Sequence, residues 1–335
     1  MADAPTPHGV AVLGGSGFAG ALACELVHRH PTLTLTAATS RSDAGRPLAE
    51  LYPRYRVPVT LSAPDLDRLG DPEAAIVAYP HGAAAPVVDG LRERGIRVVD
   101  LSADFRLADQ PTYERWYGTH GAPGRFGTAA YGLPELHRDQ ITGAELVANP
   151  GCYPTASLIA LAPLAEAGLA REVILDAKTG VSGAGRGGGD ATHFVAIAEN
   201  ASPYKVDGHR HEPEIAEQLG LLGGPDGVTF IPHLLPLDQG ELISAYVKVD
   251  GDPGDLLAMY RDRYRGEPFV EVVDHPPGMR EVRDTNRCRL TVRARPHSGL
   301  VMVFAVIDNL WKGAASQAIQ NLNLMLGLPE AEGLR

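Results

Sequence analysis

The feature that most constrains the fold is a strand, a glycine-rich turn and a helix at the start of the chain. Residues 10–13 are apolar and predict a buried strand, and apolar residues at helical spacing follow the turn through Val27. The turn carries the pattern G-x-G-x-x-G at Gly15, Gly17 and Gly20. Glycines there let the backbone approach a pyrophosphate, whose charge then meets the positive end of the helix. The pattern predicts a dinucleotide-binding unit, and the residues expected to line it are Gly14, Gly15, Ser16, Gly17 and Phe18.

The end of the second predicted strand, at residues 33–38, indicates which dinucleotide binds. An acid at this position usually hydrogen-bonds the ribose 2′-hydroxyl of NAD, whereas hydroxyls and a cation suit the 2′-phosphate of NADP. Thr39, Ser40 and Arg41 follow the strand here. NADP(H) is therefore favoured, with Ser40 and Arg41 as its contacts, and the nearby Asp43 keeps NAD open as the alternative.

Strands and helices continue to alternate beyond this point. Residues 74–78 and 96–100 predict strands on either side of a helix near 83–93, and residues 145–148 predict a further strand. Short connections between such elements are typical of a parallel, doubly wound sheet, whose ligands lie at the carboxyl ends of the strands. We expect an α/β Rossmann domain over residues 1–150. His81, which follows one strand end, is a candidate for the nicotinamide site, with a loop histidine of no function as the equal alternative.

A loop with several polar side chains follows the strand at residues 96–100. It contains Ser102, Asp104 and Arg106. An arginine there can form a two-pronged pair with a carboxylate or a phosphate, a geometry that lysine does not supply. We expect Ser102 and Arg106 to bind substrate. The alternative is a surface pair between Asp104 and Arg106 that holds the loop.

Cys152 lies where an apolar strand ends and a helix begins. Pro150 and Gly151 must end the strand, and apolar residues recur at helical spacing from residue 154 to residue 168. A thiol at the mouth of a helix meets unpaired backbone N–H groups and the positive end of the helix dipole, which favour the thiolate. We expect Cys152 to be a nucleophile and Asn149 to contact the substrate. The alternative is a small buried cysteine.

The pattern changes after this helix, and we place a domain boundary there. A strand at residues 173–179 runs into a glycine-rich loop, where Ser182 and Gly183 are expected to contact the cofactor. Strands then dominate, which predicts a second, α+β domain over residues 151–307 on a mixed or antiparallel sheet. Its exposed face suits a homo-oligomer, either a dimer or a tetramer. A final helix at residues 308–326 has one apolar stripe and is expected to pack on the first domain, so that residues 308–335 belong there.

Two histidines and an arginine lie within three residues, at His209, Arg210 and His211. Together they offer a general acid/base and a contact for an anion. We expect His211 to transfer the proton, with His209 as the other candidate, and Arg210 to bind substrate. Glu214, one helical turn later, is expected to orient the histidine. A metal site is the rival interpretation, but no third ligand of suitable type lies at a recognisable spacing, so no metal is predicted.

Composition excludes several classes of partner. The formal net charge of −11 argues against a nucleic-acid or anionic membrane surface, since both need a basic face. Cys24, Cys152 and Cys288 show no C-x-x-C spacing and are odd in number, which favours reduced thiols and a cytoplasmic location over a disulfide framework. The sequence also predicts neither a signal peptide nor a membrane span. We expect a small-molecule substrate.

Many of these motifs, in this order, resemble the family of N-acetyl-γ-glutamyl-phosphate reductases, which is grouped with aspartate-semialdehyde and glyceraldehyde-3-phosphate dehydrogenases. The resemblance implies that Cys152 is the nucleophile, that His209 or His211 is the acid/base and that NADPH is the hydride donor. It also implies a cofactor contact at Asn309. The expected reaction is reduction of N-acetyl-γ-glutamyl phosphate to the 5-semialdehyde, a step of arginine biosynthesis. The matching stretches are residues 14–20, 39–41, 80–82, 100–106, 131–135, 149–155, 208–211, 213–214, 308–310 and 312–314.

One segment departs from that family. Where the family usually has arginine, glycine and an aliphatic residue, this chain has Gln239, Gly240 and Glu241. A cation is lost there, which leaves the identity of the acyl group open. The alternatives are the same mechanism on an aspartyl or aminoadipyl phosphate, and a non-catalytic NADP-binding regulator in which Cys152 senses oxidation.

Overall fold

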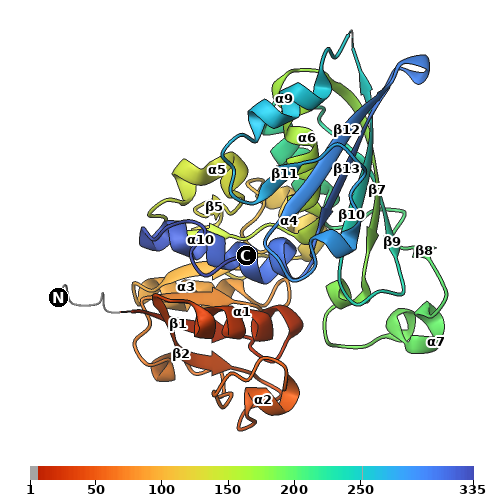
Figure 1. The fold of residues 1–335 in the computed structure, drawn as a ribbon. Helices are drawn as coiled ribbons and strands as arrows, with labels where there is room; N and C mark the ends of the chain where they lie inside the picture. The colour runs from red at the N-terminus through yellow and green to blue at the C-terminus, as the bar shows by residue number, and fades with distance from the viewer. Residues whose placement is uncertain (1–6, 251) are drawn as a thin grey trace. The chain divides into compact units, whose positions relative to one another are not determined.

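The computed structural model describes residues 7–250 and 252–335, and the chain divides into two compact units (Figure 1). The first unit contains Met1–Pro150 together with Ala314–Arg335, and the second contains Gly151–Gly313. The chain therefore leaves the first unit one residue after Asn149 and returns to it just before the last helix.

The first unit contains a six-stranded sheet in the order β2-β1-β3-β4-β6-β5, and every pairing among its described residues is parallel. All four residues of β3 are buried, as expected when helices cover both faces of a parallel sheet. Because β1 lies between β2 and β3, the topological switch point falls at its carboxyl end. The strands are β1 (His8–Leu13), β2 (Leu33–Thr39), β3 (Ala74–Val77), β4 (Arg97–Asp100), β5 (Ala130–Tyr131) and β6 (Leu146–Ala148).

Helices pack on both faces of this sheet and complete its core. Ala11 and Leu13 of β1 share an apolar cluster with Val88 and Leu91, which come from α3 on one face. The α/β Rossmann prediction is confirmed, although the sequence did not predict α4 and α5. The helices of this unit are α1 (Phe18–Arg29), α2 (Leu48–Leu51), α3 (Ala85–Glu93), α4 (Gln110–Tyr117), α5 (Pro134–Ile141) and α10 (Ser316–Leu326).

The C-terminal helix α10 packs against α1 and α5 through amide side chains as well as apolar ones. Gln317 and Asn321 both donate to the Gly132 carbonyl, at 3.1 Å and 2.8 Å. Asn321 also donates to the Asn149 side-chain oxygen at 3.0 Å. These bonds join the helix to the turn that follows β6. The preceding residues Trp311–Ala315 form a π-helical turn, so the helix begins later than the predicted residue 308.

The second unit contains a seven-stranded mixed sheet in the order β11-β12-β13-β10-β7-β9-β8. The pairs β7–β9 and β11–β12 are parallel and the others are antiparallel, which confirms the predicted mixed sheet. Its strands are β7 (Ala170–Thr179), β8 (Ser202–Pro203), β9 (Thr229–Leu234), β10 (Glu241–Val249), β11 (Val270–Val272), β12 (Cys288–Arg295) and β13 (Leu300–Ile307). Its helices are α6 (Cys152–Glu166), α7 (Phe194–Ile197), α8 (Glu212–Leu221) and α9 (Leu256–Arg263).

Helix α6 packs on β10 and β13 and forms the centre of this unit. Every residue from 153 to 165 is buried, as expected for a helix that is apolar all round. Pro163 has no N–H, so the Ile159 carbonyl one turn earlier loses its usual helical partner. The buried Tyr264 hydroxyl donates to that carbonyl instead. The helix begins at Cys152, two residues before the predicted start, because a proline at position 154 is tolerated within the first turn.

Candidate active site

The glycine-rich turn after β1 forms a cradle that suits a pyrophosphate. Gly14 has a φ of +92°, and the N–H groups of Gly14 and Gly15 donate to the Thr39 carbonyl at 3.1 Å and 2.8 Å. A Cβ on Gly20 would overlap the Gly14 carbonyl oxygen, so only glycine lets α1 approach the turn so closely. Gly17 caps α1 without a side-chain hydrogen bond, which leaves the first helical N–H groups for an anion. The cradle therefore fits a dinucleotide.

The end of β2 lies next to this cradle, since the Ser16 and Ser40 hydroxyls are 2.7 Å apart. Asp43, the acid that left NAD open, is buried, and its carboxylate accepts from Ser42 at 2.8 Å and from Arg46 at 3.1 Å. Arg41 is exposed beside it. An aspartate engaged within its own loop is poorly placed to take a ribose hydroxyl, which favours NADP over NAD.

Asp104 and Arg106 do not form the surface pair considered as an alternative, because both side chains are buried and the Asp104 carboxylate has other partners. It accepts from the N–H groups of Gly82, Ala84 and Ala85 at 2.6, 3.0 and 2.9 Å, and so holds the start of α3. These are donors that a helix start leaves unsatisfied. Asp104 therefore organises the loop after β3.

Arg106 joins two strand ends of the first unit. Its Nε donates to the Asn149 carbonyl and its Nη2 donates to the Leu101 carbonyl, each at 2.7 Å. The Ser102 hydroxyl donates to Asp100 at 2.6 Å and is fully buried. Burial raises the pKa of Asp100 to about 7, against the bonds from Ser102. Ser102, Arg106 and Asn149 are thus brought together at the carboxyl edge of the sheet, and their contact with substrate stays a prediction.

His81 lies at the same edge of the sheet. Its Nδ1 accepts from the Ala103 N–H at 2.9 Å, and its ring packs against Tyr117. This bond fixes the ring and leaves Nε2 as the nitrogen that carries the proton in the neutral form. A role at the nicotinamide stays a prediction.

Cys152 is the first residue of α6, and three groups of the second unit fix its surroundings. The Glu214 carboxylate accepts from the N–H of Gly151, the residue before it, at 3.0 Å. A Cβ added to Gly313 would lie 2.7 Å from the Cys152 Cβ, so the backbone at Gly313 packs directly on the nucleophile. Glu241 pairs with Ile307 in the sheet, and its carboxyl interacts with the Cys152 side chain, which favours the ionised carboxylate. Cys152 itself is partly exposed.

The two histidines lie beside Tyr153, the residue after the candidate nucleophile. The rings of His209 and His211 are 4.9 Å apart, and they lie 5.7 Å and 5.8 Å from the Tyr153 ring. Burial lowers the pKa of His209 to about 3, and the charges of Lys205 and Arg210 act in the same direction. Its Nδ1 accepts from the His211 N–H at 3.1 Å. His209 is therefore neutral at physiological pH, and His211 stays our candidate for proton transfer.

Glu214 shows a contact other than the predicted one, because its carboxylate holds the turn before Cys152. Orientation of a histidine by Glu214 stays a prediction. Arg210 is half-buried next to His209 and adds positive charge there. The second unit thus gathers Cys152, both histidines, Arg210 and Glu214 around the start of α6.

The predicted cofactor residues of the second unit form a hydrogen-bonded group of their own. The Ser182 hydroxyl donates to the Asp238 carbonyl at 2.6 Å and accepts from the Asn309 amide at 3.0 Å. The Asn309 side-chain oxygen accepts from the Gly240 N–H at 2.8 Å. A Cβ on Gly183 would contact the same Asn309 amide at an ordinary 3.6 Å. Their contact with a cofactor stays a prediction.

Sequence reasoning marked Glu241 as a departure from a family but assigned it no role in the site. A signal was available in the alternation of β10, because Glu241, Ile243, Ala245 and Val247 share one face of the strand and all are buried. A carboxyl on the buried face of a strand needs a hydrogen-bond partner or a function. Its contact with Cys152, by contrast, depends on the fold.

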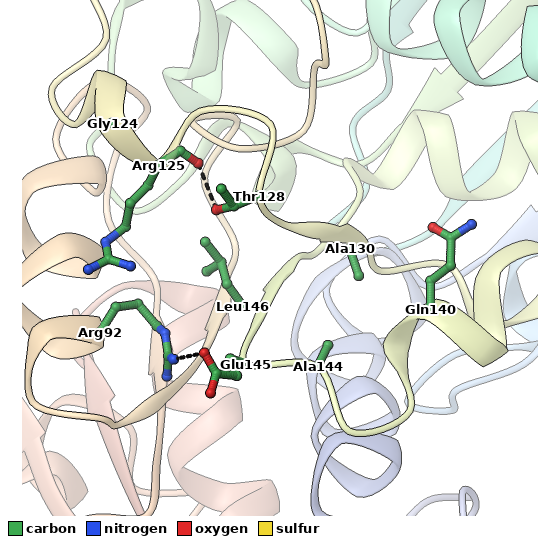
Figure 2. A pocket seen from close by; sticks show the side chains of 9 residues that line it. All are labelled: Arg92, Gly124, Arg125, Thr128, Ala130, Gln140, Ala144, Glu145 and Leu146. Atoms are coloured by element: carbon green, nitrogen blue, oxygen red, sulfur yellow. Dashed lines mark hydrogen bonds and ion pairs between the residues drawn. The ribbon is translucent and has the colours of Figure 1, made fainter.

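A separate cavity of about 340 Å³ lies in the first unit, beside the start of β6 (Figure 2). Figure 2 shows Arg92 paired with Glu145 at one side of it. Arg125, also in its lining, pairs with Asp89. This cavity adjoins the amino end of β6, whereas the glycine cradle lies at the carboxyl end of β1, so the cavity is not part of the candidate site.

Two features are absent from residues 7–250 and 252–335. No group of three or more histidine, cysteine, aspartate or glutamate side chains is placed to hold a metal ion. No helix in these ranges combines the length and the apolar composition needed to cross a membrane.

Comparison with known proteins places this fold and site in one class. The family model for the semialdehyde dehydrogenase NAD binding domain matches residues 9–144, and the model for the semialdehyde dehydrogenase dimerisation domain matches residues 152–309. Aspartate semialdehyde dehydrogenase II of Vibrio cholerae, complexed with ASA, superposes with a TM-score of 0.74 at 18% identity, over 96% of this chain and 99% of that one. The enzyme of Candida albicans, solved with NADP, gives a TM-score of 0.71 at 14% identity, over 96% and 99%. The chain has the fold of the semialdehyde dehydrogenases.

A nearer relative identifies the family. The N-acetyl-gamma-glutamyl-phosphate reductase of Alkalilimnicola ehrlichii is 48% identical over 334 residues, which cover 97% of each chain. This chain belongs to the N-acetyl-gamma-glutamyl-phosphate reductase family, as the resemblance predicted, and it is an oxidoreductase.

Replacing Gly313 tests how tightly the nucleophile is held. Gly313→Ala puts a methyl group 2.7 Å from the Cys152 Cβ, so we expect the thiol to move and turnover to fall by about a hundredfold. Gly187→Ala, which adds a Cβ with nothing within 4 Å, is the control and should keep full activity. Turnover and the rate of Cys152 alkylation are measured on both proteins. Equal turnover in the two variants would contradict the described packing.

Proposed function

We propose that this protein reduces N-acetyl-γ-glutamyl phosphate to N-acetyl-L-glutamate 5-semialdehyde and phosphate, with NADPH as the reductant, as a step of arginine biosynthesis. The observation that carries the proposal is a cysteine on the first turn of a buried helix, in a chain 48% identical to a named reductase over nearly its whole length. The glycine cradle, Ser40 and the exposed Arg41 support NADP(H) as the cofactor.

The reaction begins at Cys152. Its sulfur attacks the acyl carbon, the bond from that carbon to the phosphate oxygen breaks, and a thioester remains on the enzyme. The positive end of the α6 dipole and its first N–H groups stabilise the oxyanion. NADPH, when bound, supplies the hydride that reduces the thioester to the aldehyde level.

The histidine pair manages the protons of these steps. We assign His211 the transfer itself, since it is half-buried and its ring lies beside Tyr153, the residue after the nucleophile, whereas His209 has a pKa too low to hold a proton near neutral pH. The departing phosphate needs one proton, which a protonated His211 donates. Collapse of the thiohemiacetal then releases the aldehyde and returns the electron pair to the Cys152 sulfur. Arg210 adds the local positive charge that an anionic substrate needs in a chain of net charge −11.

The assembly and the location belong to the same proposal. We assign a homo-oligomer, a dimer or a tetramer, formed through the second unit. The name of the family model over residues 152–309 supports this, and so do Phe194 and Val195 of α7, whose side chains are 77% and 80% exposed. A reducing, cytoplasmic setting agrees with an odd number of cysteines, two of which are buried.

The reverse reaction tests the proposed function. N-acetylglutamate semialdehyde, NADP and phosphate should yield NADPH, followed by its absorbance, and the signal should vanish when phosphate is omitted. Aspartate and aminoadipate semialdehydes serve as the comparison, because Gln239 and Glu241 depart from the family pattern. Activity with only one of these two aldehydes would identify a different substrate for the same covalent mechanism. Tight NADP binding without activity on any aldehyde would contradict an enzymatic role.

Arg41→Ala tests how the cofactor is selected. Loss of a charge-assisted contact with the 2′-phosphate should weaken NADPH binding by about 10- to 100-fold and leave NADH binding unchanged. Arg68→Ala, another exposed arginine of the first unit, is the control and should bind both as the wild type does. Fluorescence titration of each nucleotide measures the effect. An equal loss for NADPH and NADH would show that Arg41 does not contact that phosphate.

A further inference from the structure

Glu241 is a fully buried carboxyl at the first residue of β10. It pairs with Thr179 of β7 on one side and Ile307 of β13 on the other, so it lies inside the sheet. Ile243 and Ala245 continue its face of the strand, and β10 packs under α6. The side chain therefore points to the helix that begins with Cys152, on the face where Gly313 contacts both Ile307 and the Cys152 Cβ, which explains its interaction with Cys152.

No other group of the described chain satisfies this carboxyl. Neither of its oxygens meets a protein donor in standard hydrogen-bond geometry. A buried carboxylate without donors loses far more hydration than it regains, so the position is costly unless the group holds a proton or serves in the reaction. The thiol of Cys152 is the group placed to supply that proton.

Asp308 is the charge that acts on the ionisation of Glu241, and the buried Lys312, which precedes Gly313, holds its ammonium 5.6 Å from the centre of the Phe269 ring. Asp308 follows β13, and its charge opposes ionisation of Glu241. The neutral Gln239 amide donates to both oxygens of Asp308, at 3.3 Å and 3.1 Å. Two tyrosines also lie near the pair: Tyr153 belongs to α6 and Tyr204 follows β8, and their hydroxyls are 3.1 Å apart. Thr179 and Ile307, which flank Glu241 in the sheet, do not titrate.

These tyrosines remain neutral and add no charge to the site. Burial raises the pKa of both far above the ordinary value, and the charges of Cys152 and Glu241 add to the shift. A thiolate and a carboxylate side by side repel each other, so ionisation of either group opposes ionisation of the other.

We propose that Glu241 is the proton partner of Cys152: the two side chains share one proton, which passes from the sulfur to the carboxylate as the nucleophile forms. This residue interacts with the side chain that carries the reacting sulfur. The sharing is a property of the free enzyme, and only its use in acyl transfer rests on the proposed function.

The proton balance of acyl transfer closes within the pair, and the hydride that brings the thioester to the aldehyde level is that of NADPH in the proposed function. The S–H bond breaks and an O–H bond forms on Glu241, while the sulfur electron pair forms the C–S bond and the phosphate leaves with the C–O pair. When the aldehyde departs, the C–S electrons return to sulfur and Glu241 gives the proton back. Burial raises the pKa of Glu241 to about 8, which brings the carboxyl into the range where it can hold the proton that leaves the sulfur.

Alkylation of the free, full-length enzyme by iodoacetamide tests the proposal without any substrate. Cys24 and Cys288 are fully buried, and mass spectrometry of the Cys152 peptide isolates the signal. From about pH 5.5 to about pH 10, we expect two ionisations in the rate profile of the wild type, because the pair loses its two protons in separate steps. Glu241→Gln, which has nothing to titrate, should show one ionisation.

Two further variants separate proton sharing from a structural effect. Glu241→Asp keeps a carboxyl and should keep two ionisations, and it provides the test if the glutamine variant does not fold. Glu25→Gln removes a buried carboxylate of α1, which pairs with Arg29, and should match the wild-type profile. With the acyl phosphate as substrate, Glu241→Gln should lower kcat by about 100-fold or more while KM changes little.

Two results would overturn the proposal. A profile of Glu241→Gln that matches the wild type would show that Glu241 does not share the thiol proton. A raised KM with unchanged kcat and two remaining ionisations would make Glu241 a substrate contact instead. If the reverse reaction fails with every aldehyde, the alkylation profile still decides whether the proton is shared, so the two proposals fail independently.

Discussion

The burial of α6 is the constraint on which the candidate active site depends. This helix is apolar on every side and therefore has to occupy the centre of the second unit. Its first residue is fixed as a consequence, because a helix held along its length has no freedom at its start. The Tyr264 hydroxyl donates to the Ile159 carbonyl, which has no helical donor because Pro163 lacks an N–H. The proline therefore does not weaken the helix. Cys152 is thereby presented by a rigid element, as precise chemistry requires.

Charge around Cys152 is divided between groups with different tasks. Glu214 satisfies the backbone N–H of Gly151 and so shapes the turn. The Glu241 carboxyl accepts no hydrogen bond from a described backbone N–H group, and it faces the thiol. His209 is kept neutral by burial, while Lys205 and Arg210 supply positive charge near it. Local cations of this kind reconcile an anionic substrate with a strongly acidic chain.

The sequence was sufficient for features that depend on local pattern. Apolar periodicity located most strands of both sheets but not the two-residue strands β5 and β8, and the glycine spacing located the cradle after β1, because a strand, a tight turn and a helix each have a local signature. The Cys152 turn was visible for the same reason. The ends of elements were less accurate, since Pro154 fits the first turn of α6 as well as its start.

Long-range partners of buried polar side chains could not be predicted in this way. Asp104 holds the start of α3 and Arg106 holds the Asn149 carbonyl, although the sequence favoured a substrate contact for the arginine and offered a surface pair as the alternative. Each partner is distant along the chain, and no periodicity specifies it. The contact of Glu241 with Cys152 belongs to the same class, because it exists only once β10 lies under α6.

The central claim is that Cys152 carries the acyl group during turnover. The most direct measurement is the intact mass of the protein after mixing with N-acetyl-γ-glutamyl phosphate in the absence of NADPH, followed by peptide mapping. The account predicts a mass gain of one N-acetylglutamyl group on the Cys152 peptide, its loss when NADPH is added, and no gain in Cys152→Ser. Turnover by a protein that never shows this adduct, or by Cys152→Ser, would contradict the covalent mechanism.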